Sequence, residues 1–363
     1  MDAEQEHLFE GVVGLLSPLM TALDALARAG RHLHPPDLGD IVVAVAPYRE
    51  PLNEAFAIFK TLQFPDHLRN FSAALAETAN NVLKGLDGFV DAPSHSNPVL
   101  AAYGSLRYQS RALETLYPLA DMLPPVSAFF LSEERREDRD LLVRFTGKRL
   151  IGFDTGVLHA ANGVTERGGF SLYVPEYATP DTPLPVIVAL HGGSGHGRAF
   201  LWTWLREART HGAILISPTS IDRTWSLMGP DVDTENLLRM LVFVRERYAV
   251  REDRLLLTGM SDGGTFSYIS GLLDNSPFTH LAPVSASFHP MLLEMTSHDR
   301  INGLPVFVTH GTLDWMFDVG MAQMAAQTLQ AAGARVRYSE VEDLSHTYPT
   351  EMNSEIMRWF RET

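Results

Sequence analysis

The sequence contains no cysteine among its 363 residues. This absence excludes disulfide bonds, thiolate ligands for zinc or iron–sulfur clusters, and a cysteine nucleophile. Basic residues are scarce, since 29 Lys and Arg stand against 44 Asp and Glu and give a formal net charge of −15. Such a charge repels nucleic-acid backbones and anionic membrane surfaces. Nucleic acid is therefore not an expected partner, and any covalent catalysis must use a residue other than cysteine.

Long apolar runs are missing as well. No stretch of the sequence reaches the ~18 consecutive apolar residues that a membrane-spanning helix needs. The N-terminal segment carries acidic residues where a secretory signal carries Lys or Arg, as its sequence shows: MDAEQEHLFEGVVGLL. We expect no membrane span, and we expect the protein to reside in the cytoplasm.

What is present divides into two parts of different texture. Over residues 1–145 the apolar residues recur at steps of three and four, which predicts an all-helical domain. Over residues 146–363 short β-rich runs alternate with longer helical windows, which predicts an α/β domain with a mostly parallel, doubly wound sheet. The helical domain shows no visible chemistry, and we expect it to act as a cap over a site or as a surface for homo-oligomer formation.

The most informative segment is the run RLLLTGMSDGGTFSYISGLL in the second domain. Here an apolar strand ends at a G-x-S-x-G turn with Ser261 at its centre, and a helix follows at once. The nucleophile of such a turn sits in a strained backbone, so that Gly259 and Gly263 pass too close to their neighbours to carry a Cβ. The competing interpretation is a glycine-rich turn without chemistry. The context of strand, turn and helix favours Ser261 as a nucleophile.

A serine nucleophile needs a base and a group that orients the base. Asp314 lies in the loop after the predicted strand LPVFVTHG, and His346 lies in the loop after the predicted strand ARVRYSEVE. Asp318 is the competing acid, but its position before a helical window predicts a helix N-cap. The chain order of Ser261, Asp314 and His346 differs from both common serine-protease orders. We predict that these three residues form a catalytic triad, with activity falling on the acid side of neutrality because His346 must be neutral to act as base.

An oxyanion hole is the remaining requirement of such chemistry. The strand LPVIVAL runs into the glycine loop HGGSGHG, and we assign the two donors to the backbone N–H groups of Gly193 and Asp262. A phosphate-binding role for this loop is the rival interpretation, but the loop lacks the Lys-Ser/Thr ending of a P-loop. We expect substrate to contact Gly192, Trp225 and Trp315, although either tryptophan could instead pack in the core.

Residues from about 148 to 363 resemble the α/β-hydrolase superfamily, and within it the phospholipase/carboxylesterase group with its polyhydroxybutyrate-depolymerase-like and feruloyl esterase relatives. The segments that carry the resemblance are LYVP, ALHGGSG, REDRLLLTGMSDGG, THGTLD and SHTYP. The resemblance implies a serine esterase. We expect it to act without a cofactor, and a helical cap would narrow access to small to medium esters. An amidase, peptidase or thioesterase with the same triad is the alternative, and a binding module on an inactive hydrolase fold is another. No His, Asp or Glu spacing in the sequence indicates a metal site.

Overall fold

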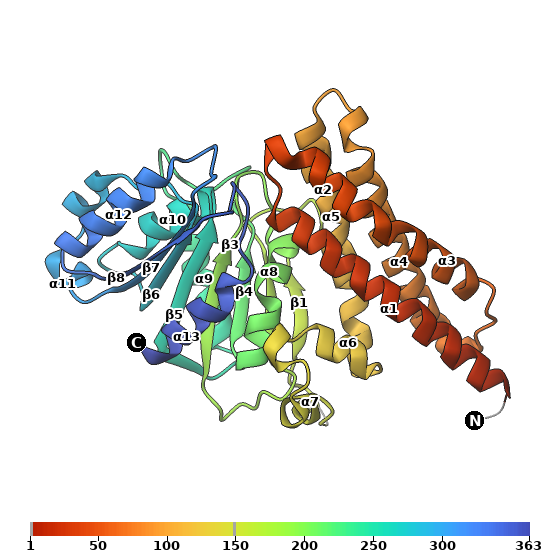
Figure 1. The fold of residues 1–363 in the computed structure, drawn as a ribbon. Helices are drawn as coiled ribbons and strands as arrows, with labels where there is room; N and C mark the ends of the chain where they lie inside the picture. Colours follow the sequence, from red (N-terminus) through yellow and green to blue (C-terminus); the bar gives the residue numbers. More distant parts are fainter. Residues whose placement is uncertain (1–2, 148–149) are drawn as a thin grey trace. The chain divides into compact units, whose positions relative to one another are not determined.

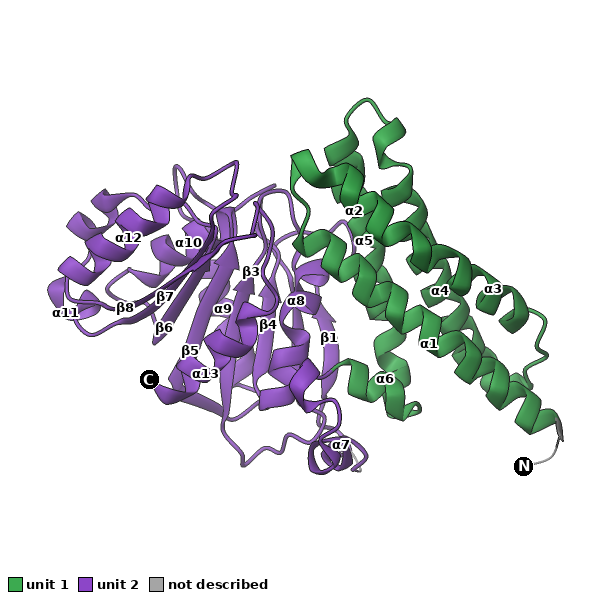
Figure 2. Cartoon of the chain, viewed as in Figure 1, with its two compact units in different colours: residues 1–130 green, residues 131–363 purple. Residues whose placement is uncertain are grey.

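The computed structural model of the chain describes residues 3–147 and 150–363. The chain divides into two compact units, Met1–Phe130 and Leu131–Thr363, which Figure 2 distinguishes by colour. The first unit is helical, and the second contains the sheet.

The boundary between the units lies at residue 130 rather than at the expected residue 145. The reason is helix α7 (Arg139–Phe145), which packs within the second unit. Its side chains Leu141 and Phe145 form an apolar cluster that includes Tyr177. The Arg209 guanidinium also lies 3.7 Å from the centre of the Phe145 ring. These contacts attach α7 to the sheet unit.

The first unit consists of helices joined by short 3₁₀ turns. Its α-helices are α1 (Ala3–Arg31), α2 (Leu38–Val45), α3 (Arg49–Phe59), α4 (Arg69–Val90), α5 (Pro98–Leu116) and α6 (Pro124–Phe129). Leu15, Leu19, Leu23 and Leu26, which are spaced three or four residues apart along α1, are buried in the core of this unit. By length and composition, α1 is the one helix in the described part of the chain that could cross a membrane, but 50% of its apolar window is buried in the structure. Helices in the core of a folded protein can be equally long and apolar.

The second unit is built on one eight-stranded sheet of order β1-β2-β4-β3-β5-β6-β7-β8. Its strands are β1 (Gly156–Ala160), β2 (Phe170–Val174), β3 (Leu184–Leu190), β4 (Ile214–Pro218), β5 (Val250–Met260), β6 (His280–Val284), β7 (Pro305–Gly311) and β8 (Arg335–Val341). Only the pairings of β2 with β1 and with β4 are antiparallel among these strands. The predicted mostly parallel sheet with a preceding helical region is confirmed.

Helices cover both faces of this sheet, as Figure 1 shows. They are α8 (Gly197–His211), α9 (Asp233–Arg245), α10 (Asp262–Gly271), α11 (His298–Ile301), α12 (Val319–Ala331) and α13 (Met352–Glu362). One apolar core joins α9, α10 and α12 to one face, while α8 and α13 pack together on the other. Parallel strands direct their carboxyl ends to one edge of a sheet, so the loops after β3, β4, β5, β7 and β8 gather there.

Candidate active site

Ser261 occupies the sharp turn between β5 and α10. Its backbone has φ 55° and ψ −120°, a conformation that residues other than glycine rarely adopt. A Cβ added to Gly259 would lie 2.6 Å from the Gly263 carbonyl group, and one added to Gly263 would lie 2.5 Å from the His191 carbonyl oxygen. The turn is therefore strained and closely packed, and only glycine fits at either position.

His346 lies between Ser261 and Asp314. Its Nε2 is 2.9 Å from the Ser261 Oγ, while its Nδ1 is 3.0 and 2.9 Å from the two carboxylate oxygens of Asp314. A carboxylate only accepts, so Nδ1 carries the proton and donates. In the neutral imidazole Nε2 is then free to accept the hydroxyl proton of Ser261. The structure thus brings together three side chains that the sequence places at the ends of three different strands.

The environment of Asp314 keeps this carboxyl ionised. Its Oδ1 accepts hydrogen bonds from the backbone N–H groups of Met316 and Phe317, each at 2.9 Å. Burial raises the pKa of Asp314, but hydrogen bonds from His346 and from the two backbone amides outweigh burial and hold that pKa below its usual value. Asp318 instead caps α12 through the Gly320 amide at 2.8 Å, as predicted for it.

His310 is a neighbour of the acid that the sequence analysis did not single out. Its Nε2 donates to the Phe317 carbonyl at 2.9 Å and lies 3.4 Å from the Asp314 Oδ2. The Phe317 ring in turn meets the His346 ring edge to face, with centroids 5.3 Å apart. His310 and Phe317 therefore fix the loop that carries Asp314. In the sequence, only the position of His310 four residues before Asp314 could have indicated this role.

The glycine loop after β3 lies against the nucleophile turn. A Cβ on Gly192 would be 3.6 Å from the Ser261 Cβ, and one on Gly193 would be 2.6 Å from the Asp262 Oδ2. Asp262 is the first residue of α10, so its N–H has no partner within the helix. The same carboxylate accepts a hydrogen bond from the Thr224 Oγ1 at 2.5 Å. The two amides predicted as oxyanion donors thus belong to segments that meet beside Ser261.

Trp225 does not lie where a substrate could reach it. Its indole is only 3% exposed, stacks on Phe266 and donates from Nε1 to the His191 carbonyl at 2.7 Å. Burial lowers the pKa of His191 to about 4, and its Nε2 accepts from the Ser220 amide. Trp225 is a core residue beneath the glycine loop, which corrects its expected role in binding. Trp315, by contrast, is 54% exposed on the loop that carries Asp314.

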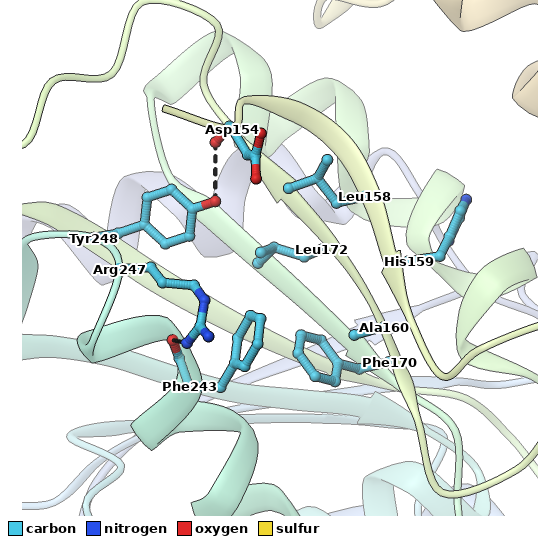
Figure 3. Close-up of a pocket in the computed structure, with 9 residues that line it drawn as sticks. All are labelled: Asp154, Leu158, His159, Ala160, Phe170, Leu172, Phe243, Arg247 and Tyr248. Carbon is cyan, nitrogen blue, oxygen red and sulfur yellow. Dashed lines mark hydrogen bonds between the residues drawn. The ribbon is translucent and has the colours of Figure 1, made fainter. Parts of the chain in front are cut away.

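A cavity of about 240 Å³ lies outside this site, between strands β1 and β2 and the end of α9 (Figure 3). Its floor is apolar, with Arg247 and Asp154 among its other lining residues. None of its lining residues belongs to the triad or to the glycine loop. Within residues 3–147 and 150–363, no three His, Asp or Glu side chains are grouped closely enough to hold a metal ion.

Comparison with known proteins finds one family match, which lies within the sheet unit. Residues 232–362 match the phospholipase/carboxylesterase family, a segment that contains Ser261, Asp314 and His346 and begins after the glycine loop. No curated protein sequence matches the chain significantly.

Solved structures similar to the chain share little sequence with it. A thermostable esterase is 21% identical over 57% of this chain and 62% of its own, with a TM-score of 0.46. The substrate-bound fluorophosphonate-binding serine hydrolase F of Staphylococcus aureus is 15% identical over 58% of this chain and 100% of its own, with a TM-score of 0.44. Acyl-protein thioesterase 2 of Zea mays is 18% identical over 53% and 97%, with a TM-score of 0.41. Residues 232–362 thus carry the pattern of the phospholipase/carboxylesterase family, and they lie in a unit built on a mostly parallel sheet of the kind expected for an α/β-hydrolase fold.

Proposed function

We propose that the protein is a serine carboxylesterase that hydrolyses small to medium carboxylic esters through an acyl-enzyme on Ser261. The observation that carries the proposal is the continuous hydrogen-bonded chain from Ser261 through His346 to Asp314. All three residues are at least nine-tenths buried, so water competes little for these hydrogen bonds.

The reaction follows from the positions of the donors and acceptors. The Ser261 Oγ attacks the ester carbonyl carbon while the His346 Nε2 takes the hydroxyl proton, and Asp314 stabilises the imidazolium that forms. The N–H groups of Gly193 and Asp262 bind the oxyanion of the tetrahedral intermediate. This intermediate collapses, His346 returns the proton to the departing alcohol, and the acyl group remains on Ser261. A water molecule activated by His346 then releases the acid.

The substrate class rests on the loop after β7. Leu313, Trp315 and Met316 are 40%, 54% and 51% exposed there, while Asp314 between them points inward. We propose that these apolar side chains, with Gly192 beside Ser261, contact the acyl or alcohol part of the ester. The cytoplasmic location and the function of the helical unit as a cap or oligomerisation surface remain proposals that rest on the sequence.

The test is covalent labelling by a fluorophosphonate combined with ester turnover. We expect labelling and hydrolysis of p-nitrophenyl esters in the wild-type protein, and loss of both in Ser261→Ala. Ser276→Ala is the matched control, because this serine lies in the loop after α10 and its buried hydroxyl has no hydrogen-bond partner in the structure. Labelling that persists in Ser261→Ala contradicts the assignment. Faster turnover of p-nitroanilides or thioesters than of the matched esters contradicts the substrate class and leaves the triad intact.

A further inference from the structure

Arg167, in the loop before β2, donates to the two loops that border the proposed oxyanion hole. Its Nη1 lies 3.2 Å from the carbonyl oxygen of Gly195, in the glycine loop after β3. Its Nε lies 3.1 Å from the carbonyl oxygen of Ser220, and its Nη2 lies 3.4 Å from that of Arg223, both in the loop after β4. The Nη2 also donates to the Ser220 hydroxyl. One half-buried guanidinium therefore contacts residues that lie 28 to 56 positions further along the chain.

The contacts of Arg167 reach the residue that follows the proposed oxyanion donor. Ser194 has φ 60°, a conformation that costs free energy for any residue with a Cβ and persists only when its surroundings hold it. Its N–H donates to the Arg223 carbonyl at 3.1 Å, and its Oγ accepts from the Arg223 Nε at 2.8 Å. The Arg223 carbonyl is also an acceptor for Arg167. Arg167 thus holds the Arg223 carbonyl, which also accepts the hydrogen bond from the Ser194 N–H. Ser194 directly follows Gly193, whose N–H is the proposed oxyanion donor.

The loop after β4 offers a firm support for this contact. The Asp233 carboxylate is 1% exposed and accepts from the Ile221 amide at 2.9 Å and from the Ser226 amide at 2.8 Å. The Asp233 carboxylate therefore fixes the loop at both of these residues. Arg167 connects this fixed loop to Gly195 in the glycine loop beside Ser261, where the glycines have no side chains to restrain the backbone.

We propose that Arg167 is a positioning residue that fixes the direction of the Gly193 N–H and so keeps the oxyanion hole formed before substrate arrives. The inference rests on the proposed function of Ser261. Arginine suits the task because its planar guanidinium carries five donors, whereas the lysine ammonium is a compact group with three. An ammonium at this position could not reach both loops with the same geometry.

Loss of the guanidinium should weaken the transition state more than the bound substrate. The oxyanion forms only during the reaction, so a displaced Gly193 amide lowers kcat and leaves KM nearly unchanged. Removing an oxyanion donor outright costs about 10²–10³ in turnover, so loosening the loop that holds one should cost about 10–100-fold. The lysine variant should retain part of the lost turnover.

The experiment compares Arg167→Met and Arg167→Lys with Arg300→Met in the full-length protein. Arg300 is a matched control because it is also half-buried and donates to backbone carbonyls, those of Gly271 and Phe278. It lies on α11, before β7, and so at the opposite edge of the sheet from Ser261. Each variant is measured for kcat and KM on a p-nitrophenyl ester, for melting temperature, and for inhibition by a trifluoromethyl ketone.

The ketone separates a positioning function from a purely structural one. The Ser261 Oγ bonds to the carbonyl carbon of the ketone. The C=O π bond opens to an oxyanion, and the hydroxyl proton of Ser261 passes to His346. We expect Arg167→Met to bind the ketone about 10–100-fold more weakly, in parallel with kcat, while KM changes less than about threefold.

Equal changes of kcat and ketone affinity in Arg167→Met and Arg300→Met overturn the inference. If Arg167→Met does not fold, Arg167→Lys decides: reduced kcat and ketone affinity at an unchanged melting temperature support the inference, and wild-type values refute it. A wild-type protein without Ser261-dependent turnover instead refutes the proposed function, and the inference with it.

Discussion

Replacing Asp314 by asparagine should reverse the hydrogen-bond polarity of His346. The Asp314 Oδ1 accepts from the Met316 and Phe317 amides, so the single oxygen of asparagine must stay at that position. The amide NH₂ then takes the place of Oδ2, which lies 2.9 Å from the His346 Nδ1. Since this NH₂ only donates, Nδ1 must become an acceptor, and the imidazole proton moves to Nε2.

A proton on Nε2 prevents the imidazole from accepting one from Ser261. Loss of the correct tautomer in a serine hydrolase lowers kcat by about 10⁴, which corresponds to about 5 kcal/mol of transition-state stabilisation. The packing of the loop is retained because asparagine has nearly the same shape. KM should therefore change little, and steady-state hydrolysis of a p-nitrophenyl ester measures both constants.

Asp318→Asn is the matched control for this substitution. Asp318 lies four residues further along the same loop and is exposed, and its Oδ1 caps α12. Asparagine is as good an N-cap as aspartate, so stability and turnover should both remain near the wild-type values. The reasoning is refuted if Asp314→Asn retains more than about one tenth of the turnover, or if the two variants lose equal amounts.

The same pair of variants tests the charge of Asp314 through the stability of the fold. The pKa of Asp314 lies below its usual value in the folded protein, so its ionised form stabilises the fold above about pH 4. This stabilisation is lost as the pH falls through the lower folded pKa. Urea unfolding should therefore show Asp314→Asn less stable than wild type at pH 7 and the difference shrinking towards pH 3. A difference that does not depend on pH would contradict the ionised state of Asp314.

The triad could be predicted because each of its members follows a strand that the sequence marks clearly. Residues at the carboxyl ends of parallel strands converge whatever the length of the helices between them. The choice between Asp314 and Asp318 as the acid of the triad could also be made, because a residue that precedes a helical window can serve as its N-cap. These inferences depend on where strands and helices end, which short segments of sequence encode.

Two strands of the sheet were not predicted, for physical reasons specific to each. Strand β6 contains Pro283, which lacks the N–H that a central strand normally donates, and proline argues against such a strand. Strand β1 is a short edge strand with the mixed burial of a half-exposed segment, so its sequence shows little apolar alternation. Strand β6 forms by pairing with β5 and β7, and β1 forms by pairing with β2, and this pairing overrides their weak local preference.

The contacts that surround the triad could not be predicted, because they join segments that no local pattern relates. Trp225 is an aromatic residue on a loop near the catalytic edge, and only the burial of its ring beneath the glycine loop shows that it belongs to the core. Arg167 and Thr224 contact the site through hydrogen bonds to residues 28 to 56 positions away. Arginine and threonine are common on surfaces, so neither the residue type nor the spacing distinguishes these two from the rest.

Two further substitutions test the packing on which the site rests. Arg209→Met should destabilise the protein by about 3–5 kcal/mol in urea unfolding, because it leaves the Glu176 carboxylate, 2% exposed in its ion pair, without its charge partner. The double variant with Glu176→Gln should recover part of this loss, and additive losses would argue against a coupled pair. Gly263→Ala should lower both the melting temperature and the turnover, because its Cβ would lie 2.5 Å from the His191 carbonyl oxygen and push the glycine loop away from the nucleophile turn. Gly104→Ala is the control, since no atom lies within 4 Å of its added Cβ and alanine in a helix interior is favoured by about 0.5–1 kcal/mol. If Gly263→Ala also keeps wild-type turnover, the close approach of the two segments does not set the geometry of the oxyanion hole.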